Sequence, residues 1–287
     1  MQQTPATTIP SLHIFETKPH GGSVDATAKE QELRRLMREM RQVLVAYSGG
    51  VDSSYLAYIA NDEIGVNALS VLGISPSVSE FQKQEAVSTA QLFSLNFEML
   101  ETREVENEHY SANPANRCYF CKSELYEKLT AVAATRNIGF VLDGTNADDL
   151  RDARPGRVAA NEKQVRSPLA EVGLTKAEIR ELSRTAGLPS WEKPASPCLA
   201  SRIAYGVPVT IERLSKVEAA EQCIRDLGFR EFRVRSHGDL ARIEISPAEL
   251  DRALNKDFAD SVSHRLTEIG FKFVTLDLKG FRSGSMN

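Results

Sequence analysis

The stretch VLVAYSGGVDSS, residues 43–54, decides the fold. It begins as a short, mainly apolar run typical of a buried strand, and its two glycines lead into a segment of helical composition. Glycine permits positive φ and close approach of a ligand, and the start of a helix presents free N–H groups to an anion. The stretch therefore predicts either a tight strand–helix turn with a serine cap or a loop that binds phosphate.

The next hundred residues alternate between apolar runs and amphipathic segments. Strands are expected over 66–73, 96–100 and 138–146, and helices over 27–41, 53–63, 77–94 and 123–137. In the helix over 77–94, Ser77 and Glu80 have the spacing of a capping box. The alternation predicts an α/β fold with a doubly wound parallel sheet, in which ligands bind beyond the carboxyl ends of the strands.

A second α/β pattern begins after Gly206. A helix over 175–187 precedes it, a helix is expected over 210–228, and strands are expected over 229–237, 240–246 and 270–278. We predict a flexible N-terminal arm (1–26), a larger nucleotide-binding domain (27–204) and a smaller C-terminal α/β domain (205–287) for the substrate or for oligomerisation.

Composition narrows the class of protein. A net charge of −4 over 287 residues argues against a nucleic-acid partner, which needs a basic face. No run of 18 apolar residues and no secretory signal are found, so we expect a cytoplasmic protein without a membrane anchor. In such a reducing compartment, cysteines serve metal binding or reactivity more often than disulfides.

The four cysteines differ in their surroundings. Cys118 and Cys121 form a C-x-x-C, which alone fits a redox pair, a zinc knuckle or half of an iron–sulfur site. Cys198 lies in a proline-stiffened segment, expected to be a fixed exposed loop, with Arg202 near enough to favour thiolate. Cys223 falls inside an amphipathic helix and is expected to be a small buried hydrophobe.

The glycine-rich loop lacks the Gly-Lys-Ser/Thr ending of kinase-type phosphate loops. It resembles the pyrophosphate loop of the ATP pyrophosphatase (PP-loop) superfamily, which cleaves ATP between the α- and β-phosphates. In DGTNADD, which follows the expected fourth strand, Asn146 and Asp149 fit either an Asx-rich turn or side chains that close over a nucleotide. The expected nucleotide-binding residues are Ser48, Gly49, Gly50, Asp52, Ser53, Ser54, Asn146, Asp149 and Arg202.

Several strings occur in order that together resemble the LarE family of ATP-dependent sulfur transferases. They are SGGVDSS, NRCYFCK, DGTNADD, RSPLAEVGLTKAEIRELSRTAGLP, KPASPCLASRIAYG and LDLKGFRSGSMN. The resemblance implies an adenine nucleotide alpha hydrolase-like fold and a pyridinium-3,5-biscarboxylic acid mononucleotide substrate. ATP with Mg²⁺ would adenylate each carboxylate, and a sulfur nucleophile would then displace AMP. By the same resemblance, the product would serve the nickel-pincer cofactor of lactate racemase.

The family uses two sulfur routes. Some members sacrifice the sulfur of one cysteine, at the position of Cys198, whereas others hold a [4Fe–4S] cluster on three cysteines. Cys118, Cys121 and Cys198 resemble the cluster type, with a zinc half-site or free thiols as the alternative. The resemblance also implies a homo-oligomer, with a hexamer as one form. Weaker candidates are Glu221 for a divalent ion and Arg233, Asp251 and Arg282 around the substrate phosphate.

Three other functions fit parts of this pattern. A tRNA thiolase would use the same loop but should carry an RNA-binding appendage and a basic face. An NAD synthetase would share the loop and would have no need of three cysteines. A nucleotide-gated iron–sulfur or zinc protein would release no pyrophosphate with any acid substrate.

Overall fold

The computed structural model describes residues 25–151 and 155–282. Of the predicted N-terminal arm, residues 1–24 lie outside this range. Within it, no helix is both long enough and apolar enough to cross a membrane.

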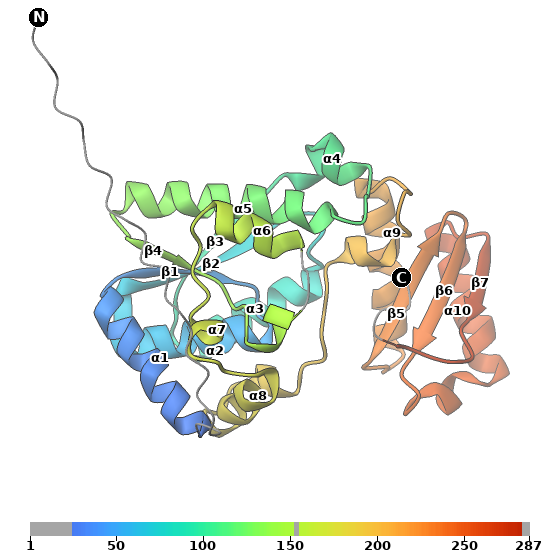
Figure 1. Cartoon of the computed structure of the whole chain (residues 1–287). Helices are drawn as coiled ribbons and strands as arrows, with labels where there is room; N and C mark the ends of the chain where they lie inside the picture. Colours follow the sequence, from blue (N-terminus) through green and yellow to red (C-terminus); the bar gives the residue numbers. More distant parts are fainter. Residues whose placement is uncertain (1–24, 152–154, 283–287) are drawn as a thin grey trace, which may run out of the picture.

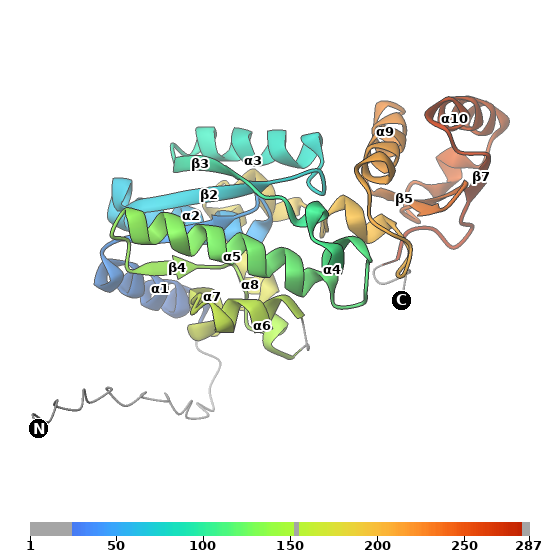
Figure 2. The ribbon, with the colours of Figure 1, turned by 90° about the horizontal axis from the view of Figure 1, so that it is seen from above.

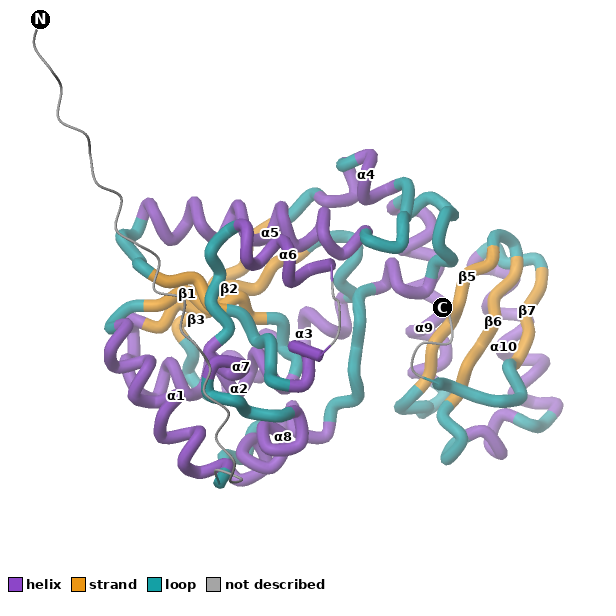
Figure 3. Tube along the Cα trace, viewed as in Figure 1, coloured by secondary structure: helices purple, strands orange, loops and turns teal. Residues whose placement is uncertain are grey.

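The larger sheet has four parallel strands in the order β3-β2-β1-β4 (Figure 1). Figure 3 shows the strands of the protein in orange, in two separate groups. The strands are β1 (Val43–Tyr47), β2 (Ala68–Ile74), β3 (Asn96–Glu101) and β4 (Phe140–Leu142). The chain winds from β1 to β3 in one direction and then returns to place β4 on the other side of β1. The prediction of a doubly wound parallel α/β fold is confirmed, and the loops after β1 and β4 meet at the point where the winding reverses.

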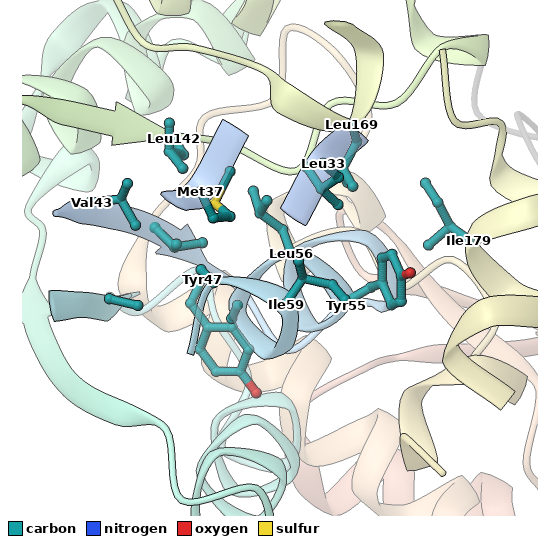
Figure 4. Close-up of a cluster of buried hydrophobic side chains, with 14 of the residues drawn as sticks. Leu33, Met37, Val43, Tyr47, Tyr55, Leu56, Ile59, Leu142, Leu169 and Ile179 are labelled. Atoms are coloured by element: carbon teal, nitrogen blue, oxygen red, sulfur yellow. The ribbon is translucent and has the colours of Figure 1, made fainter. Parts of the chain in front are cut away.

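Helices cover both faces of this sheet (Figure 2). They are α1 (Ala26–Met40), α2 (Val51–Ile64), α3 (Glu80–Leu92), α5 (Arg117–Thr135), α6 (Pro155–Glu162) and α8 (Lys176–Thr185), with short helices α4 (Glu108–Ser111) and α7 (Pro168–Glu171). Because side chains alternate along a strand, β1 serves both cores. Val43, Val45 and Tyr47 pack against α1, α2, α3 and α8 (Figure 4), whereas Leu44 packs with α5 and α6.

Two predicted helix starts are wrong. Helix α3 begins at Glu80, and its capping box joins Ser79 to Gln82 rather than Ser77 to Glu80. Ser77 lies outside the helix because its hydroxyl, 2.7 Å from the hydroxyl of Tyr110, is used in a buried contact. Helix α5 begins at Arg117 rather than at residue 123, so both cysteines of the C-x-x-C lie in its first turns.

The smaller sheet has the order β5-β6-β7, with β5 and β6 antiparallel and β6 and β7 parallel. Its elements are α9 (Ile211–Asp226), β5 (Phe232–His237), β6 (Leu240–Ile245), α10 (Lys256–Ile269) and β7 (Phe273–Leu276). A core of its own lies between the sheet and these helices and includes Cys223, which is buried as predicted.

A further apolar cluster contains residues from the segments around both sheets. Tyr110 and Leu199 pack in it with Leu214 and Val217 of α9, and Cys121 and Cys198 lie against it. Because this cluster takes residues from both sides of position 205, the domain boundary placed there stays a prediction.

Candidate functional site

The loop 48–54 joins the carboxyl end of β1 to the first turn of α2. The Ser48 amide donates to the hydroxyl oxygen of Ser53 at 3.1 Å, and the two hydroxyls lie 2.9 Å apart, so Ser53 closes the loop. Ser48 and Gly50 are exposed, whereas Ser54 is fully buried. Amides in the first turn of a helix have no acceptor within the helix. The exposed edge of this loop can therefore receive an anion.

Gly49 fits this loop for two reasons. Its φ is +72°, a left-handed conformation that favours glycine. A Cβ at this position would also lie 2.6 Å from the Cβ of Ala86 on α3. The loop is thus closed against the side of α3.

The loop after β4 backs the glycine-rich loop. A Cβ on Gly144 would lie 2.8 Å from the Ser53 amide nitrogen, so the two backbones touch. Asn146 accepts from the amides of Asp148 and Asp149, and the Asn146 amide donates to the Asp149 carboxylate at 3.1 Å. The Asx-rich turn that the sequence allowed is therefore present, and it sits beside the predicted nucleotide loop.

Asp52 is paired with a lysine that the sequence motif did not reveal. Lys176, the first residue of α8, places its ammonium 2.5 Å from one Asp52 carboxylate oxygen, and Asn146 donates to the other at 3.4 Å. The loop itself lacks a lysine, but α8 supplies one beside it. This side chain could be found only from the fold, because 124 positions separate it from Asp52.

The three candidate thiols share one neighbourhood. Burial, followed by the nearby Cys198, raises the pKa of the Cys118 thiol, although the residue as a whole is exposed. Burial, followed by Glu104 and Cys198, also raises the pKa of Cys121. Cys121 and Cys198 are half-buried against the same apolar cluster. The fold therefore brings together cysteines that lie about eighty positions apart, as sulfur chemistry at one site requires.

Lys122 connects these thiols to the sheet edge. Its ammonium lies 5.3 Å from the ring centre of Tyr126. Its pKa is raised chiefly by Tyr126, with Cys121, Asp143 and Cys118 contributing. Asp143 directly follows β4. The ammonium of Lys122 therefore interacts electrostatically both with the thiols and with the loop beside the predicted nucleotide site. Sequence reasoning missed Lys122 because it reads as an ordinary helical lysine next to the C-x-x-C.

A buried ion pair contacts the Cys198 loop and holds it in place. Arg202 and Glu221 lie 2.9 Å apart with side chains 3% and 7% exposed. Arg202 also donates to the backbone oxygens of Pro197 and Cys198. Each guanidinium nitrogen thus already has a protein acceptor. A nucleotide role for Arg202, or a metal role for Glu221, would need part of this arrangement to open, and both stay predictions.

Arginines gather beside this pair on β5. Arg233 is 6% exposed, its guanidinium donates to the backbone oxygens of Phe232 and Ala195, and it lies 4.8 Å from the ring centre of Phe281. Burial, followed by repulsion from Arg202, lowers the pKa of Arg233 to about 10. A buried guanidinium without a carboxylate in ion-pair contact among the described residues suits a phosphate, which would restore its charge balance.

The two remaining candidates lie nearer the surface. Arg282 follows Phe281 and its guanidinium is 3.7 Å from the Asp277 carboxylate. The structure therefore brings the end of the described chain next to Arg233. Asp251 is exposed on a short helix, Leu250–Ala253. Their proposed contacts with substrate stay predictions.

The thiols match an iron–sulfur cluster in donor type. Within residues 25–151 and 155–282, however, no three His, Cys, Asp or Glu side chains are grouped closely enough to hold a metal ion. The raised thiol pKa values mean that iron would have to displace protons in order to bind. The described residues thus bring thiols of the right chemical type into one neighbourhood, but not at the distances that bind a metal ion. The [4Fe–4S] cluster and Mg²⁺ both stay predictions.

Comparison with known proteins decides the family, although no family model matches. The chain is 36% identical over 260 residues to the pyridinium-3,5-bisthiocarboxylic acid mononucleotide synthase of Lactiplantibacillus plantarum, which spans 90% of this chain and 94% of that protein. The chain belongs to the LarE family. An uncharacterised protein of Synechocystis is 44% identical over 91% of this LarE-family chain and 97% of its own length.

A more distant relative places the family in its superfamily. Cytoplasmic tRNA 2-thiolation protein 1 of Malassezia globosa is 28% identical over 154 residues, covering 49% of this LarE-family chain and 39% of that protein. This match supports the PP-loop assignment. Neither the homo-oligomer nor the cytoplasmic location predicted from the sequence is tested by these relatives, and both stay predictions.

Proposed function

We propose that this chain inserts sulfur into pyridinium-3,5-biscarboxylic acid mononucleotide in an ATP-dependent reaction, giving the bisthiocarboxylic acid form. The L. plantarum relative carries the name of that synthase, and the alignment covers almost all of it. The observation that carries the proposal is the shared neighbourhood of Cys118, Cys121 and Cys198. A nucleotide loop alone would fit many enzymes, whereas a fold that also gathers three thiols fits sulfur transfer.

The first half of the reaction belongs to the loop 48–54. A carboxylate is a poor electrophile, so one of its oxygens attacks the α-phosphorus of ATP, and the bond between the α- and β-phosphates breaks. Pyrophosphate leaves, and the exposed loop amides and the Ser48 hydroxyl would receive it. The acyl-adenylate that remains has AMP as a good leaving group.

The second half belongs to the thiols. A sulfur nucleophile attacks the acyl carbon, the bond to AMP breaks, and sulfur stays on the substrate. If Cys198 is the donor, its sulfur first forms a thioester; loss of the α-proton and cleavage of the Cβ–S bond then give a thiocarboxylate and leave dehydroalanine. Cys118, Cys121 and Cys198 would alternatively hold a [4Fe–4S] cluster, which would supply a sulfide instead. The second carboxylate is converted in the same way; in the Cys198 route this takes a second copy of the chain, because each cysteine gives up one sulfur.

Transfer to tRNA is the second candidate, and two observations favour the mononucleotide. The tRNA-thiolation relative matches over only 39% of its length, against 94% for the synthase. The net charge of −4 also gives the chain no overall attraction to a polyanion.

One anaerobic experiment tests the proposal. The purified chain, untreated or after iron and sulfide reconstitution, is incubated with the biscarboxylic acid mononucleotide, ATP and Mg²⁺, and product and protein are weighed by mass spectrometry. Thiocarboxylate with unchanged protein mass supports the cluster route, and protein lighter by one H₂S supports sacrifice of Cys198. Cys198→Ala should be inactive whichever route operates. Cys118→Ala should be inactive only if the cluster route operates. Absence of thiocarboxylate in both preparations rejects the proposal.

A further inference from the structure

Helix α3 packs against the predicted nucleotide loop at Gly49. Ala86 lies directly against Gly49, where no side chain could fit between them. The Tyr47 hydroxyl, at the end of β1, donates to the backbone oxygen of Ala86 at 2.9 Å. The position of α3 therefore fixes one wall of the loop 48–54.

The same helix and the segment before it hold the Cys198 loop. The side-chain amide nitrogen of Gln82 donates to the backbone oxygen of Ser196 at 2.8 Å and to its hydroxyl at 2.9 Å. The Leu199 amide donates to the backbone oxygen of Ser77 at 2.8 Å. These contacts lie on either side of Cys198. The thiol is thus carried by a short piece of backbone that is held at both ends by one segment, 77–82.

The side-chain amide of Gln82 makes two separate sets of hydrogen bonds, one through its oxygen and one through its nitrogen. Its oxygen accepts from the Ser79 backbone amide at 3.3 Å and from the Ser79 hydroxyl at 3.2 Å, which completes the capping box of α3. Its nitrogen is the end that reaches Ser196. Helix starts use either glutamate or glutamine in this role. Only glutamine also offers a donor, so the capping box alone does not require it.

Gln82 and Ala86 are four positions apart and so lie on one face of α3. That face contacts the nucleotide loop through Ala86 and the thiol loop through Gln82. We propose that Gln82 is a positioning residue, which sets the place of the Cys198 thiol relative to the loop that receives pyrophosphate. The inference rests on the proposed function, because only a transfer from a sulfur donor at Cys198 to an adenylate at the nucleotide loop needs this spacing.

Gln82 shares this task with a second support. Arg202 donates to the backbone oxygens of Pro197 and Cys198. Residues 194–197 are exposed, and Arg233 adds one more contact by donating to the backbone oxygen of Ala195. Loss of the Gln82 donor should therefore loosen the Cys198 loop without unfolding it.

Two variants separate positioning from helix capping. Gln82→Glu keeps an acceptor for Ser79 but places a carboxylate oxygen against the Ser196 backbone oxygen, so the hydrogen bond to that backbone oxygen is replaced by repulsion and only the Ser196 hydroxyl can still bond there, as a donor. Ser79→Ala removes the cap and leaves the Gln82 nitrogen in place. Because the cap stabilises α3, we expect Ser79→Ala to lower the melting temperature by about 2 to 4 °C, and Gln82→Glu to lower it by less.

Two measurements on the full-length chain test the inference. The first is the rate of Cys198 alkylation by iodoacetamide without nucleotide, read by peptide mass spectrometry. Gln82→Glu should raise it about fivefold, the factor expected when a neutral hydrogen bond is lost, whereas Ser79→Ala should not. The second is thiocarboxylate formed per pyrophosphate released with the mononucleotide substrate. Gln82→Glu should lower this ratio severalfold, because adenylation continues while transfer fails.

The outcomes distinguish the inference from the function on which it rests. If wild-type protein releases no pyrophosphate with the mononucleotide, the proposed function fails, while the alkylation rates still test whether Gln82 holds the loop. If wild-type protein is active and Gln82→Glu matches it in both the alkylation rate and the ratio, Gln82 is not a positioning residue. Equal loss in Ser79→Ala and Gln82→Glu would likewise overturn the inference, because helix capping alone would then explain it.

Discussion

The predicted nucleotide loop and the predicted thiol site are built in different ways. Residues 48–54 take the shape of their loop mainly from contacts within the segment, although α3 and Lys176 pack against it: Ser53 closes the loop, Gly49 supplies the left-handed turn, and the helix that follows starts at once. The thiol site instead draws Cys118 and Cys121 from α5 and Cys198 from a loop that α3 and Arg202 hold in place.

This difference separates a local site, formed mainly within one segment, from an assembled site, formed by segments that are distant in the sequence. A local site takes most of its geometry from its own short segment and meets its neighbours at few points. An assembled site depends on contacts made by residues that never touch the reacting atoms. Substitutions should therefore act on the nucleotide loop through the loop itself and on the thiol site through its supports.

The largest loss of activity is expected for Gly49→Ala. The new Cβ would meet Ala86 at 2.6 Å and would also occupy a left-handed conformation. Overpacking of this kind, added to the backbone strain, should cost about 3 kcal/mol of unfolding free energy and abolish pyrophosphate release. Denaturant unfolding and a pyrophosphate assay measure the two effects.

Gly173→Ala is the matched control for this change. Gly173 has a φ of +73°, and a Cβ there would meet nothing within 4 Å. It should cost only the strain of the left-handed backbone, about 1 to 2 kcal/mol, with pyrophosphate release retained. Equal losses at Gly49 and Gly173 would show that contact with α3 does not matter to the loop.

The next largest loss of activity is expected for Glu221→Ala, which leaves Arg202 as a buried charge without its carboxylate partner. Removing one partner of a buried ion pair costs about 3 to 5 kcal/mol, and the Cys198 loop should loosen with it. The double variant Arg202→Met, Glu221→Met should regain much of the unfolding free energy but not the transfer of sulfur. Denaturant unfolding, with mass spectrometry of the thiocarboxylate product, checks both expectations. A loss below about 1 kcal/mol in Glu221→Ala would show that the pair is not a support.

The smallest effect is expected in the pH dependence of Cys118. Its raised pKa keeps the thiol protonated near neutral pH, so alkylation should be slow there and should accelerate about tenfold per pH unit below that pKa. The cation of Lys122 acts in the opposite direction and lowers this pKa. Lys122→Met should therefore raise it further and slow alkylation by about two- to threefold at a fixed pH.

Lys128→Met serves as the control on the same helix. Lys128 pairs with Glu124 at 3.0 Å and does not contribute to the pKa of Cys118. Its substitution should leave the pH profile of Cys118 alkylation unchanged. Faster alkylation in Lys122→Met would contradict the electrostatic account of the thiol site.

The same contrast explains what could be predicted from the sequence. The loop 48–54 and the parallel sheet follow from local patterns, and both the sheet and the burial of Cys223 are confirmed. The supports could not be predicted, because Lys176 meets Asp52 across 124 positions and Gln82 meets Ser196 across 114. The choice of Ser79 over Ser77 as the cap of α3 also depends on a distant residue, Tyr110. Two capping boxes fit the local pattern, and tertiary contact selects one.

The central claim is that ATP is used to activate a carboxylate of the mononucleotide for sulfur transfer. The most direct test uses substrate labelled with ¹⁸O in its carboxylates and follows the label into AMP by mass spectrometry. Adenylation of the carboxylate, followed by attack of sulfur on the acyl carbon, must leave one carboxylate oxygen on AMP for every sulfur inserted. We expect one labelled AMP per thiocarboxylate formed. Unlabelled AMP, or ADP and phosphate as the products, would contradict the account.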